Sequence, residues 1–194
     1  MVLVLGTSNE HKVAEFTRVL KGISIASLAE VNCHLDVAET GATYRDNAIL
    51  KARAFAKATG AWVLSDDTGL EVDALNGAPG VFSARYAGQQ ATGSENVQKL
   101  LLDMKDVVDR RATFHCALAL ANPQGEVVLE SSGVLPGTIL ESPVGEGGFT
   151  YDFVFFEQKS GCTLAEMPGF AVDQLSHRAV AVKAILPQMQ TLLS

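Results

Sequence analysis

The sequence predicts an α/β fold in which helices flank a mixed β-sheet. In the N-terminal part, short apolar runs alternate with segments of helical periodicity, the order expected for βαβ units with parallel strands. Further on, two strand-like runs at 112–122 and 125–140 meet at Asn122-Pro123-Gln124-Gly125, a turn sequence that favours an antiparallel hairpin. A sheet that contains both kinds of connection has to be mixed.

The first half of the chain shows the βαβ pattern most clearly. Residues 2–6 form a short apolar run that ends at a glycine, and they are predicted to be a buried strand. Apolar residues at helical spacing predict a helix over 9–20, and 23–27 is a second strand candidate. A long helix is then expected over 43–59, and Gly60 supplies the stop signal at its C-terminal end.

The second half is harder to assign. A strand is expected at 61–67, whereas 68–93 is rich in glycine and small residues and predicts no regular element. The remaining expected elements are a helix over 94–104, a strand over 147–156 and an amphipathic terminal helix over 175–193. Because no repeat, low-complexity tract or linker interrupts the chain, residues 1–194 are predicted to form one domain.

Composition excludes several classes of protein. Hydrophobic residues make up 47% and charged residues 19% of the chain, which is typical of a globular protein and not of a disordered one. The apolar runs are too short to cross a bilayer, so no membrane partner is expected. The start of the chain lacks the basic region and cleavage site of a signal peptide, and it is interpreted as a strand.

Cysteine usage and net charge indicate the cellular compartment and the classes of ligand to expect. Cys33, Cys116 and Cys162 are odd in number, widely spaced and without a C-x-x-C pair, which favours a reducing compartment and hence a cytoplasmic protein. The histidines show no H-x-x-x-H pair, so a zinc site is not expected. A formal net charge of −7 argues against a nucleic-acid partner. A small polyanion remains a possible ligand if the few cations gather in one place.

Residues 6–12, with the sequence GTSNEHK, connect the first strand to the first helix. A helix start offers N–H groups and the positive end of the helix dipole, so Thr7, Ser8, Asn9 and Lys12 are candidates for phosphate binding. Lys12 supports this interpretation, because a cation in the first turn opposes the dipole unless an anion lies nearby. The alternative is simple N-capping, with Thr7 in a capping box. The pattern is not that of a P-loop.

A second candidate site combines a loop with the helix that follows it. Glu39 lies in the aperiodic stretch 35–43, which is expected to be a loop. In the next helix, Asn47 and Lys51 fall beside an apolar stripe, and polar groups beside a buried face require partners. Either Lys51 extends its stem to reach the surface, or Asn47 and Lys51 face a cleft. The sequence leaves both alternatives open.

The third candidate is the sequence Ser65-Asp66-Asp67-Thr68-Gly69 at the end of an apolar strand. Open α/β sheets place ligands beyond the carboxyl ends of their strands. Carboxylate oxygens suit Mg²⁺, and one carboxylate can hold the ion while the other orients or deprotonates a water molecule. A polar turn of the Asx type is the alternative. Adjacent strand residues point to opposite faces, so the sequence does not decide which aspartate is the base.

A fourth candidate is the glycine-rich stretch 147–152, with the sequence GGFTYD. Glycine allows the backbone to approach a ligand closely, Phe149 offers a face for stacking, and Asp152 offers an acceptor for ring N–H groups. A glycine-rich turn into an aromatic strand with no ligand would show the same pattern.

The fifth candidate, LSHR at 175–178, opens the expected terminal helix. His177 and Arg178 place cationic side chains in the first helical turn, the same inversion that Lys12 shows. Two such helix starts in a chain of net charge −7 suggest one shared polyanion.

Taken in order, these five segments resemble the inosine triphosphate pyrophosphatase family, whose members remove non-standard purine nucleotides. The opening TSNEHKVAEF fits the family pattern T-x-N-x-x-K-x-x-E. The later blocks follow in the family's order, namely ETGATYRDNAILKAR, SDDTGLEVDALNGAPGVFSARY, GGFTYD and LSHR. Each motif alone is weak, but five in order across nearly the whole chain are highly specific.

The resemblance implies a fold, a reaction and a cofactor. The family has an elongated mixed sheet that is split into two lobes by a central active-site cleft, and its members are typically homodimers. They hydrolyse ITP, dITP and XTP to the nucleoside monophosphate and pyrophosphate, and they require Mg²⁺. An activated water attacks the triphosphate, and incorporation of the wrong nucleotide into nucleic acid is prevented.

The resemblance also implies roles for residues. Glu39 and Asp67 would hold the metal, with Asp66 as a further candidate ligand, and Asp67 would be the general base. The expected phosphate-side residues are Thr7, Ser8, Asn9, Lys12 and Lys51, and Thr68 would touch the substrate. The expected base-side residues are Phe149, which would stack on the purine, with Thr150, Tyr151, Asp152, His177 and Arg178.

Three positions depart from the family pattern. Val172 stands where the family usually has a lysine, and Thr150 and Phe153 replace a glycine and a proline. All three belong to the base-reading end, so broader or altered nucleotide specificity is the first alternative. A catalytically silent nucleotide-binding protein is the second, although Glu39 and Asp67 argue against it. A general phosphatase is a third, and it would release orthophosphate.

Overall fold

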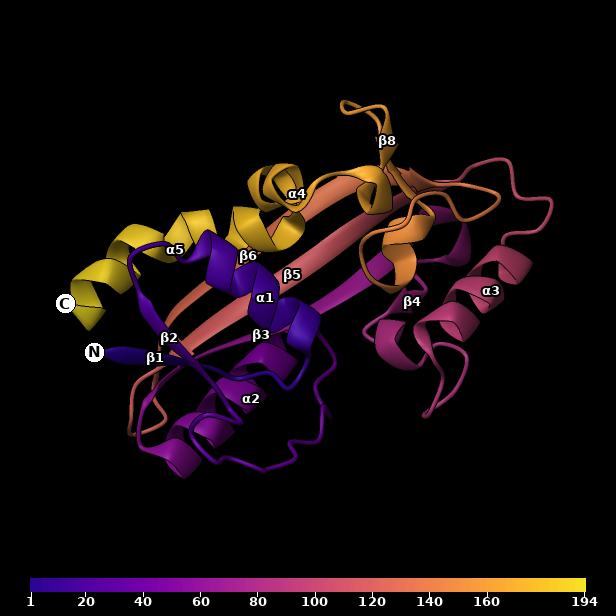
Figure 1. The fold of residues 1–194 in the computed structure, drawn as a ribbon. Coiled ribbons are helices and arrows are strands. Elements are labelled where there is room, and N and C mark those ends of the chain that lie inside the picture. The colour runs from indigo at the N-terminus through magenta and orange to yellow at the C-terminus, as the bar shows by residue number, and fades with distance from the viewer. The chain divides into compact units, whose positions relative to one another are not determined.

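The computed structural model describes all 194 residues, and a single mixed sheet of eight strands runs through it (Figure 1). The strand order is β2-β1-β3-β5-β6-β7-β8, with β4 paired to β3. The strands are β1 (Val2–Leu5), β2 (Ser24–Ser27), β3 (Trp62–Val72), β4 (Pro79–Gly80), β5 (Arg111–Ala121), β6 (Val127–Ile139), β7 (Phe155–Glu157) and β8 (Cys162–Thr163). The helices are α1 (Glu10–Val19), α2 (Tyr44–Thr59), α3 (Gly93–Asp103), α4 (Gly169–Leu175) and α5 (His177–Leu193).

Both kinds of strand pairing are present, which confirms the predicted mixed α/β class. Strand β1 pairs in parallel with β2 and with β3. The pairs β3–β4, β6–β7 and β7–β8 are antiparallel. Strands β5 and β6 are neighbours, and the predicted turn between them closes through the Gly125 N–H, which donates to the Asn122 carbonyl at 2.8 Å.

The chain divides into two compact units. Unit 1 contains Met1–Asp67, Cys116–Gly133 and His177–Ser194. Unit 2 contains Thr68–His115 and Val134–Ser176. Each unit has its own buried core, and the two are described separately.

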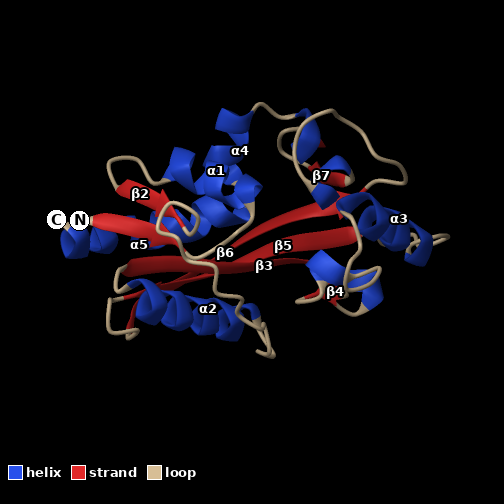
Figure 2. Ribbon diagram, turned by 60° about the horizontal axis from the view of Figure 1, so that its bottom comes forward, coloured by secondary structure: helices blue, strands red, loops and turns tan.

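In unit 1, helices cover both faces of the sheet (Figure 2). Alternate residues of β1 and β3 face opposite ways, as strand geometry requires. Leu64 packs with Phe16 of α1 and Ile185 of α5, whereas the neighbouring Val63 packs with Phe55 of α2. In the part of β3 that belongs to unit 1, neighbouring side chains therefore point alternately to the α1 and α5 face and to the α2 face.

In unit 2, a core beneath α3 supports a turn that the sequence analysis singled out. Phe114 and Phe155 stack with their ring centroids 4.6 Å apart. Tyr151 is buried in the same cluster, and its hydroxyl donates to the carbonyl of Ser83 at 2.9 Å. This hydrogen bond ties the turn that contains Phe149 to a segment far away in the sequence.

One predicted strand differs from the structure. Residues 147–156 are not one strand, because Thr150–Phe153 is a short 3₁₀ helix and only Phe155–Glu157 pairs in the sheet. Thr150 has a φ of +50°, which is incompatible with an extended strand. The terminal helix expected over 175–193 is present as α5, and Ser176, with an extended ψ of 151°, separates it from α4.

Strand β3 is longer than predicted, and it does not end at the two aspartates. It continues to Val72 because Leu70 and Glu71 pair with β4. The glycine-rich stretch that predicted no element supplies this partner strand. The two aspartates thus lie within a strand and not in an Asx turn.

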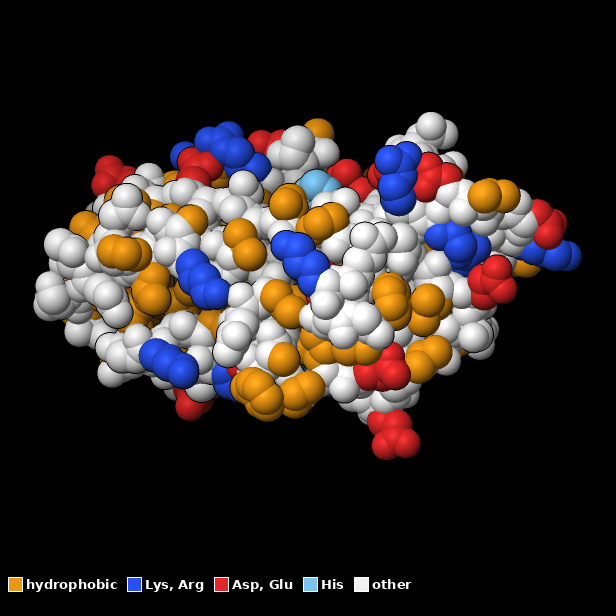
Figure 3. Space-filling view, turned by 90° about the horizontal axis from the view of Figure 1, so that it is seen from above, with side chains coloured by type: hydrophobic (Ala, Val, Ile, Leu, Met, Phe, Trp, Pro, Cys, Tyr) orange, Lys and Arg blue, Asp and Glu red, His pale blue; other side chains and the backbone are white.

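No helix is long and apolar enough to cross a membrane. On the face seen in Figure 3, basic side chains are scattered among acidic and apolar ones and do not form one basic patch.

Candidate active site

The turn after β1 is held by main-chain hydrogen bonds and requires a glycine. The N–H of Gly6 donates to the Leu64 carbonyl of β3 at 2.8 Å. A Cβ atom at Gly6 would lie 2.0 Å from Ser65 Oγ, so no other residue fits without displacement. Asn9 caps α1 by accepting from the N–H groups of His11 and Lys12 at 3.0 and 3.3 Å.

Thr7 does not form the predicted capping box. Its hydroxyl oxygen instead accepts from the Asn9 N–H at 3.2 Å and so stabilises the capping residue. Ser8 is exposed in the same turn. The start of α1 is therefore N-capped, which was the simpler of the two alternatives. The polar side chains of the turn surround a stretch that is accessible to solvent.

Lys12 extends from the first turn of α1 to Asp66 on β3. Its Nζ lies 2.8 Å from Asp66 Oδ2, and the Asp66 side chain is fully buried. Burial by itself raises the pKa of Asp66, but the positive charges of Lys12 and Arg178 outweigh it and hold the pKa well below its usual range. Asp66 is thus a buried, ionised carboxylate.

Arg178, at the start of α5, joins the same cluster. Its Nε lies 3.5 Å from Asp66 Oδ2, and its Nη1 forms an ion pair with Glu15 of α1. Burial lowers the pKa of Arg178, but the nearby Glu15 and Asp66 carboxylates raise it by more. The net pKa lies above its ordinary value, so the guanidinium stays charged. Lys12, Glu15, Asp66 and Arg178 are called the α1–α5 cluster below.

A second cluster lies on α2 and contains the other aspartate. Lys51 Nζ lies 2.6 Å from Glu39 Oε1 and 3.6 Å from Asp67 Oδ1. Burial raises the pKa of Asp67 above its usual value; Lys51 lowers it and Glu39 raises it further. The ammonium group of Lys51 therefore does not simply extend to the surface, because it lies between the two carboxylates.

Asn47 links the loop, the helix and the strand. Its Nδ2 donates to Asp67 Oδ2 at 3.0 Å, and its Oδ1 accepts from the Gly41 N–H at 2.8 Å. A Cβ atom at Gly41 would lie 2.7 Å from Asn47 Oδ1, so the glycine permits this close approach. Asn47 thereby fixes the loop that carries Glu39 beside Asp67. Glu39, Asn47, Lys51 and Asp67 are called the α2 cluster.

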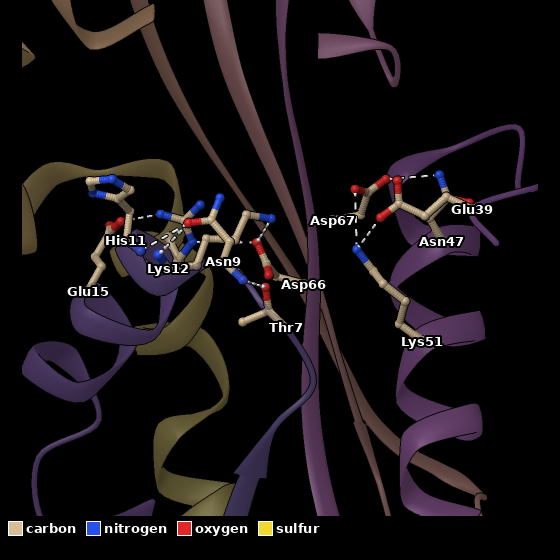
Figure 4. Close-up of polar contacts among 11 residues, drawn as sticks. Thr7, Asn9, His11, Lys12, Glu15, Glu39, Asn47, Lys51, Asp66 and Asp67 are labelled. Carbon is tan, nitrogen blue, oxygen red and sulfur yellow. Dashed lines mark hydrogen bonds and ion pairs between the residues drawn. The ribbon is translucent and has the colours of Figure 1, made fainter. Parts of the chain in front are cut away.

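Figure 4 shows the two clusters on opposite sides of β3. Asp66 points towards α1, and Asp67 points towards α2, as adjacent residues in a strand must. The structure therefore brings Glu39 and Asp67 together around one lysine and places Asp66 with a different pair of cations. No group of three or more acidic, histidine or cysteine side chains is arranged to hold a metal ion.

In unit 2, the predicted base-side residues at 149–152 form one tight turn. The N–H of Phe149 donates to Asp152 Oδ2 at 2.7 Å, so this carboxylate caps the 3₁₀ helix. Phe149 is 46% exposed, whereas Tyr151 is buried. Thr68 belongs to this unit, and Val172 packs half-buried against the unit 2 core. His177 belongs to unit 1, where it is buried at the start of α5.

Glu15 was not among the predicted site residues, whereas Asn47 was named beside Lys51 in the second candidate site. Glu15 follows Lys12 by three positions and Asn47 precedes Lys51 by four, so each shares a helix face with a predicted cation. That spacing was the available signal. The ion pair across to α5 could not be found from the spacing, because it depends on tertiary packing.

The chain has a mixed α/β fold in which lysines of α1 and α2 face two aspartates of β3, beside a capped strand-to-helix turn. This arrangement is typical of the class of α/β proteins that bind anionic ligands. Within this class, the chain belongs to the Ham1 family, whose model matches residues 3–188.

Similar proteins cover nearly the full length of the chain. The dITP/XTP pyrophosphatase of Escherichia coli is 44% identical over 192 residues, with 97% of this chain and 98% of that protein covered. The dITP/XTP pyrophosphatase of a Nostoc species is 42% identical over 193 residues, with 100% and 96% covered.

Solved structures of Ham1 proteins share the fold of this chain. The Ham1 protein of Staphylococcus aureus superposes with a TM-score of 0.87 at 36% identity, with 99% of this chain and 100% of that chain covered. A HAM1 protein from Coxiella burnetii gives a TM-score of 0.88 at 39% identity, with 98% and 99% covered.

Proposed function

We propose that this protein is a Mg²⁺-dependent nucleoside-triphosphate pyrophosphatase that hydrolyses ITP, dITP and XTP to the nucleoside monophosphate and pyrophosphate. The names of its relatives supply the substrate class. The observation that carries the chemistry is the α2 cluster, in which Glu39 and Asp67 converge on the ammonium group of Lys51. Such an enzyme removes wrong purine nucleotides before they enter nucleic acid.

The donor set of the α2 cluster fits a divalent ion. Glu39 and Asp67 offer hard carboxylate oxygens, and both already face one cation. Mg²⁺ in phosphate-processing sites is commonly held by one or two carboxylates together with substrate phosphates. We assign Glu39 and Asp67 as its ligands. When bound, the ion supplies Lewis-acid polarisation and offsets charge on the phosphates.

Asp67 is the general base of the proposal. It accepts a proton from the attacking water while the α,β-anhydride bond breaks and pyrophosphate leaves. Burial raises the pKa of Asp67, which makes its carboxylate a stronger proton acceptor than an exposed aspartate. The hydrogen bond from Asn47 Nδ2 to Asp67 Oδ2 fixes the direction of the side chain.

The cations next to the strand ends bind the triphosphate. Lys12 and Lys51 offset its negative charge, and the polar residues of the turn, Thr7, Ser8 and Asn9, orient it. Lys51 has an additional role, because it holds Glu39 and Asp67 together without ligand. Thr68, which follows Asp67 directly, contacts the substrate in this proposal.

The base-reading residues come from the turn in unit 2 and from the start of α5. Phe149 stacks on the purine, and its exposure makes one face of the ring accessible. Asp152, His177 and Arg178 read the edge of the base, and Thr150 and Tyr151 shape the turn. A 6-oxo group accepts a hydrogen bond where a 6-amino group donates one, so donors in the site favour hypoxanthine over adenine.

The proposal includes the setting of the enzyme. None of the three cysteines forms a disulfide, which supports a cytoplasmic location in this proposal. We take residues 1–194 as one catalytic domain of two lobes, active as a homodimer, and we assign it neither a nucleic acid nor a membrane as partner.

The test is pyrophosphate release from ITP, dITP, XTP, ATP, GTP and dUTP, with and without Mg²⁺. The proposal expects fast, metal-dependent release from the first three and little from the others. Orthophosphate in place of pyrophosphate would identify a general phosphatase. Nucleotide binding without any release would identify a silent binding protein.

Broader nucleotide specificity is the second candidate, and Val172 favours it. The side chain at this position packs against an apolar core and supplies no charge near the base-reading turn. Under this alternative, ATP and GTP are also cleaved, and Val172→Lys raises the preference for dITP over dGTP by about tenfold, the value of one charge-assisted contact. An unchanged ratio in Val172→Lys would show that this position does not set specificity.

A further inference from the structure

Asp66 is the most enclosed charged side chain of unit 1, with 0% of its side chain exposed. A carboxylate that has lost its water is unstable unless cations or donors replace that water. A single oxygen, Oδ2, lies 2.8 Å from Lys12 Nζ and 3.5 Å from Arg178 Nε. One buried atom therefore faces a cation from α1 and a cation from α5.

The rest of the α1–α5 cluster balances these charges. Glu15 pairs with Arg178, and the guanidinium carbon lies 5.6 Å from the ring centroid of Phe16. Two cations and two anions thus meet among α1, β3 and α5. Lys12 is the most exposed of the four at 19%, against 13% for Glu15 and 8% for Arg178. Lys12 therefore has the most solvent access within the cluster, and the Arg178 side chain is largely covered.

The metal ligands of the proposed function lie elsewhere. Glu39 and Asp67 belong to the α2 cluster on the opposite face of β3 (Figure 4). Asp66 has its Oδ2 already shared by two cations, and its side chain is fully covered. A carboxylate in that position is arranged to orient cations and not to bind Mg²⁺.

We propose that Asp66 is a positioning residue that aligns Lys12 with the phosphates and Arg178 with the purine, and that it is not a metal ligand. This inference rests on the proposed function, in which Lys12 and Arg178 serve opposite ends of the substrate. Through Asp66, the phosphate-binding end and the base-reading end share one anchor. Arg178 keeps Glu15 as a second partner, so loss of Asp66 shifts the guanidinium and does not release it.

The test compares Asp66→Asn with Glu39→Gln, which removes a proposed metal ligand. Mn²⁺ binding to the substrate-free protein is measured by calorimetry, and kcat and KM for dITP and dGTP are measured at saturating Mg²⁺. For Asp66→Asn we expect Mn²⁺ affinity within about twofold of the parent, KM for dITP raised about tenfold and kcat changed less than about threefold. The dITP preference should fall as well. Glu39→Gln should lose at least about tenfold in Mn²⁺ affinity.

Two results overturn the inference. If Asp66→Asn loses Mn²⁺ affinity as Glu39→Gln does, Asp66 is a metal ligand. If it lowers kcat with KM and base preference unchanged, Asp66 acts in the chemical step. A double-mutant cycle with Arg178→Lys adds a third check, because strictly additive effects on base preference would contradict the proposed coupling.

Two further measurements keep the inference testable in every case. If Asp66→Asn does not fold, Asp66→Glu retains the charge but displaces the oxygen, and the same pattern of raised KM and unchanged Mn²⁺ affinity is expected. If the parent protein releases no pyrophosphate, the proposed function fails. Calorimetric binding of pyrophosphate and dIMP then replaces KM, and equal affinities in parent and Asp66→Asn would overturn the role of Asp66.

Discussion

The two units use their buried and half-buried charges differently. In unit 1, charged side chains face one another, as Lys12 faces Asp66 and Lys51 faces both Glu39 and Asp67. In unit 2, Arg110 and Glu157 face the main chain, although the half-buried Lys99 pairs with Asp103. Arg110 donates to the carbonyls of four residues, namely Met104, Val107, Ile139 and Leu140. Glu157 accepts from the N–H groups of Lys159 and Ser160.

This difference predicts which charged residues affect activity and which affect the stability of the fold. An ion pair between side chains can exchange one partner for a charged ligand, since the partner is itself mobile. A charge that satisfies main-chain groups cannot leave without exposing buried carbonyls or N–H groups. Charges in unit 1 should therefore control activity, and those in unit 2 should control stability.

The largest expected effect is on catalysis. Asp67→Asn keeps the shape of the side chain but removes the base, so kcat for dITP should fall by a factor of about 10² to 10⁴. Pyrophosphate release and thermal unfolding are measured together. Asp109→Asn, which removes an exposed carboxylate, is the control and should leave kcat unchanged. More than about a tenth of the parent kcat in a folded Asp67→Asn protein would reject the assignment of the base.

The opposite pattern is expected for Arg110→Met in unit 2. The substitution leaves carbonyls of Met104, Ile139 and Leu140 without a charged donor, so the free energy of unfolding should fall by about 2–4 kcal/mol. The activity per folded molecule should stay the same. Arg45→Met is the matched control: its ion pair with Glu130 is exposed, and its loss should cost less than about 1 kcal/mol. Urea unfolding measures both, and loss of activity without loss of stability would break the comparison.

The sequence predicted unit 1 better than unit 2, for a physical reason. Strand β1, helix α1 and helix α2 carry periodic apolar patterns and cap residues, and these local signals survive in the fold. The turn at Thr150–Phe153 was predicted as a strand, because its shape depends on Asp152 capping Phe149 and on Tyr151 reaching Ser83. Neither the local cap nor the long-range bond to Ser83 leaves a periodic trace in the sequence.

The candidate site also has some features that the sequence predicts and others that only the fold determines. The presence of Lys12, Lys51 and the two aspartates could be predicted from motifs. Which aspartate faces which lysine could not, because β3 continues past both residues and sends their side chains to opposite faces. That assignment requires knowing what packs on each face of the sheet, which is a property of the whole fold.

A smaller, pH-dependent effect is expected at Glu157. Burial raises the pKa of this carboxyl, but the hydrogen bonds from Ser160 and Lys159 outweigh it and lower the pKa below its ordinary value of 4.5. Since the folded-state pKa is the lower one, the carboxylate stabilises the fold above about pH 4.5, and this contribution is lost as the pH falls through the folded-state pKa. Glu157→Gln should therefore cost about 1 kcal/mol at pH 7 and progressively less below pH 4.5. Urea unfolding across this range measures it, and a difference that is constant with pH would show that the charge of Glu157 plays no part.

The smallest expected effect concerns the turn that carries Phe149. Thr150 has a φ of +50°, a region that a β-branched residue enters at a cost of about 1–3 kcal/mol. Glycine removes that cost but gains freedom in the unfolded chain, worth about 0.4–1 kcal/mol in the opposite direction. Thr150→Gly should thus stabilise the protein by roughly 0.5–1 kcal/mol.

Thr150→Ala separates backbone strain from side-chain contact at this position. Alanine keeps the Cβ atom and hence the strain, but it removes the hydroxyl, which would lie 2.8 Å from a Cβ atom on Gly93. We expect Thr150→Ala to be no more stable than the parent in urea. If Thr150→Gly is instead destabilised, the contact with α3 outweighs the strain. In that case a side chain, and not only main-chain hydrogen bonds, holds the turn of unit 2, and the contrast between the two units would be limited to their charges.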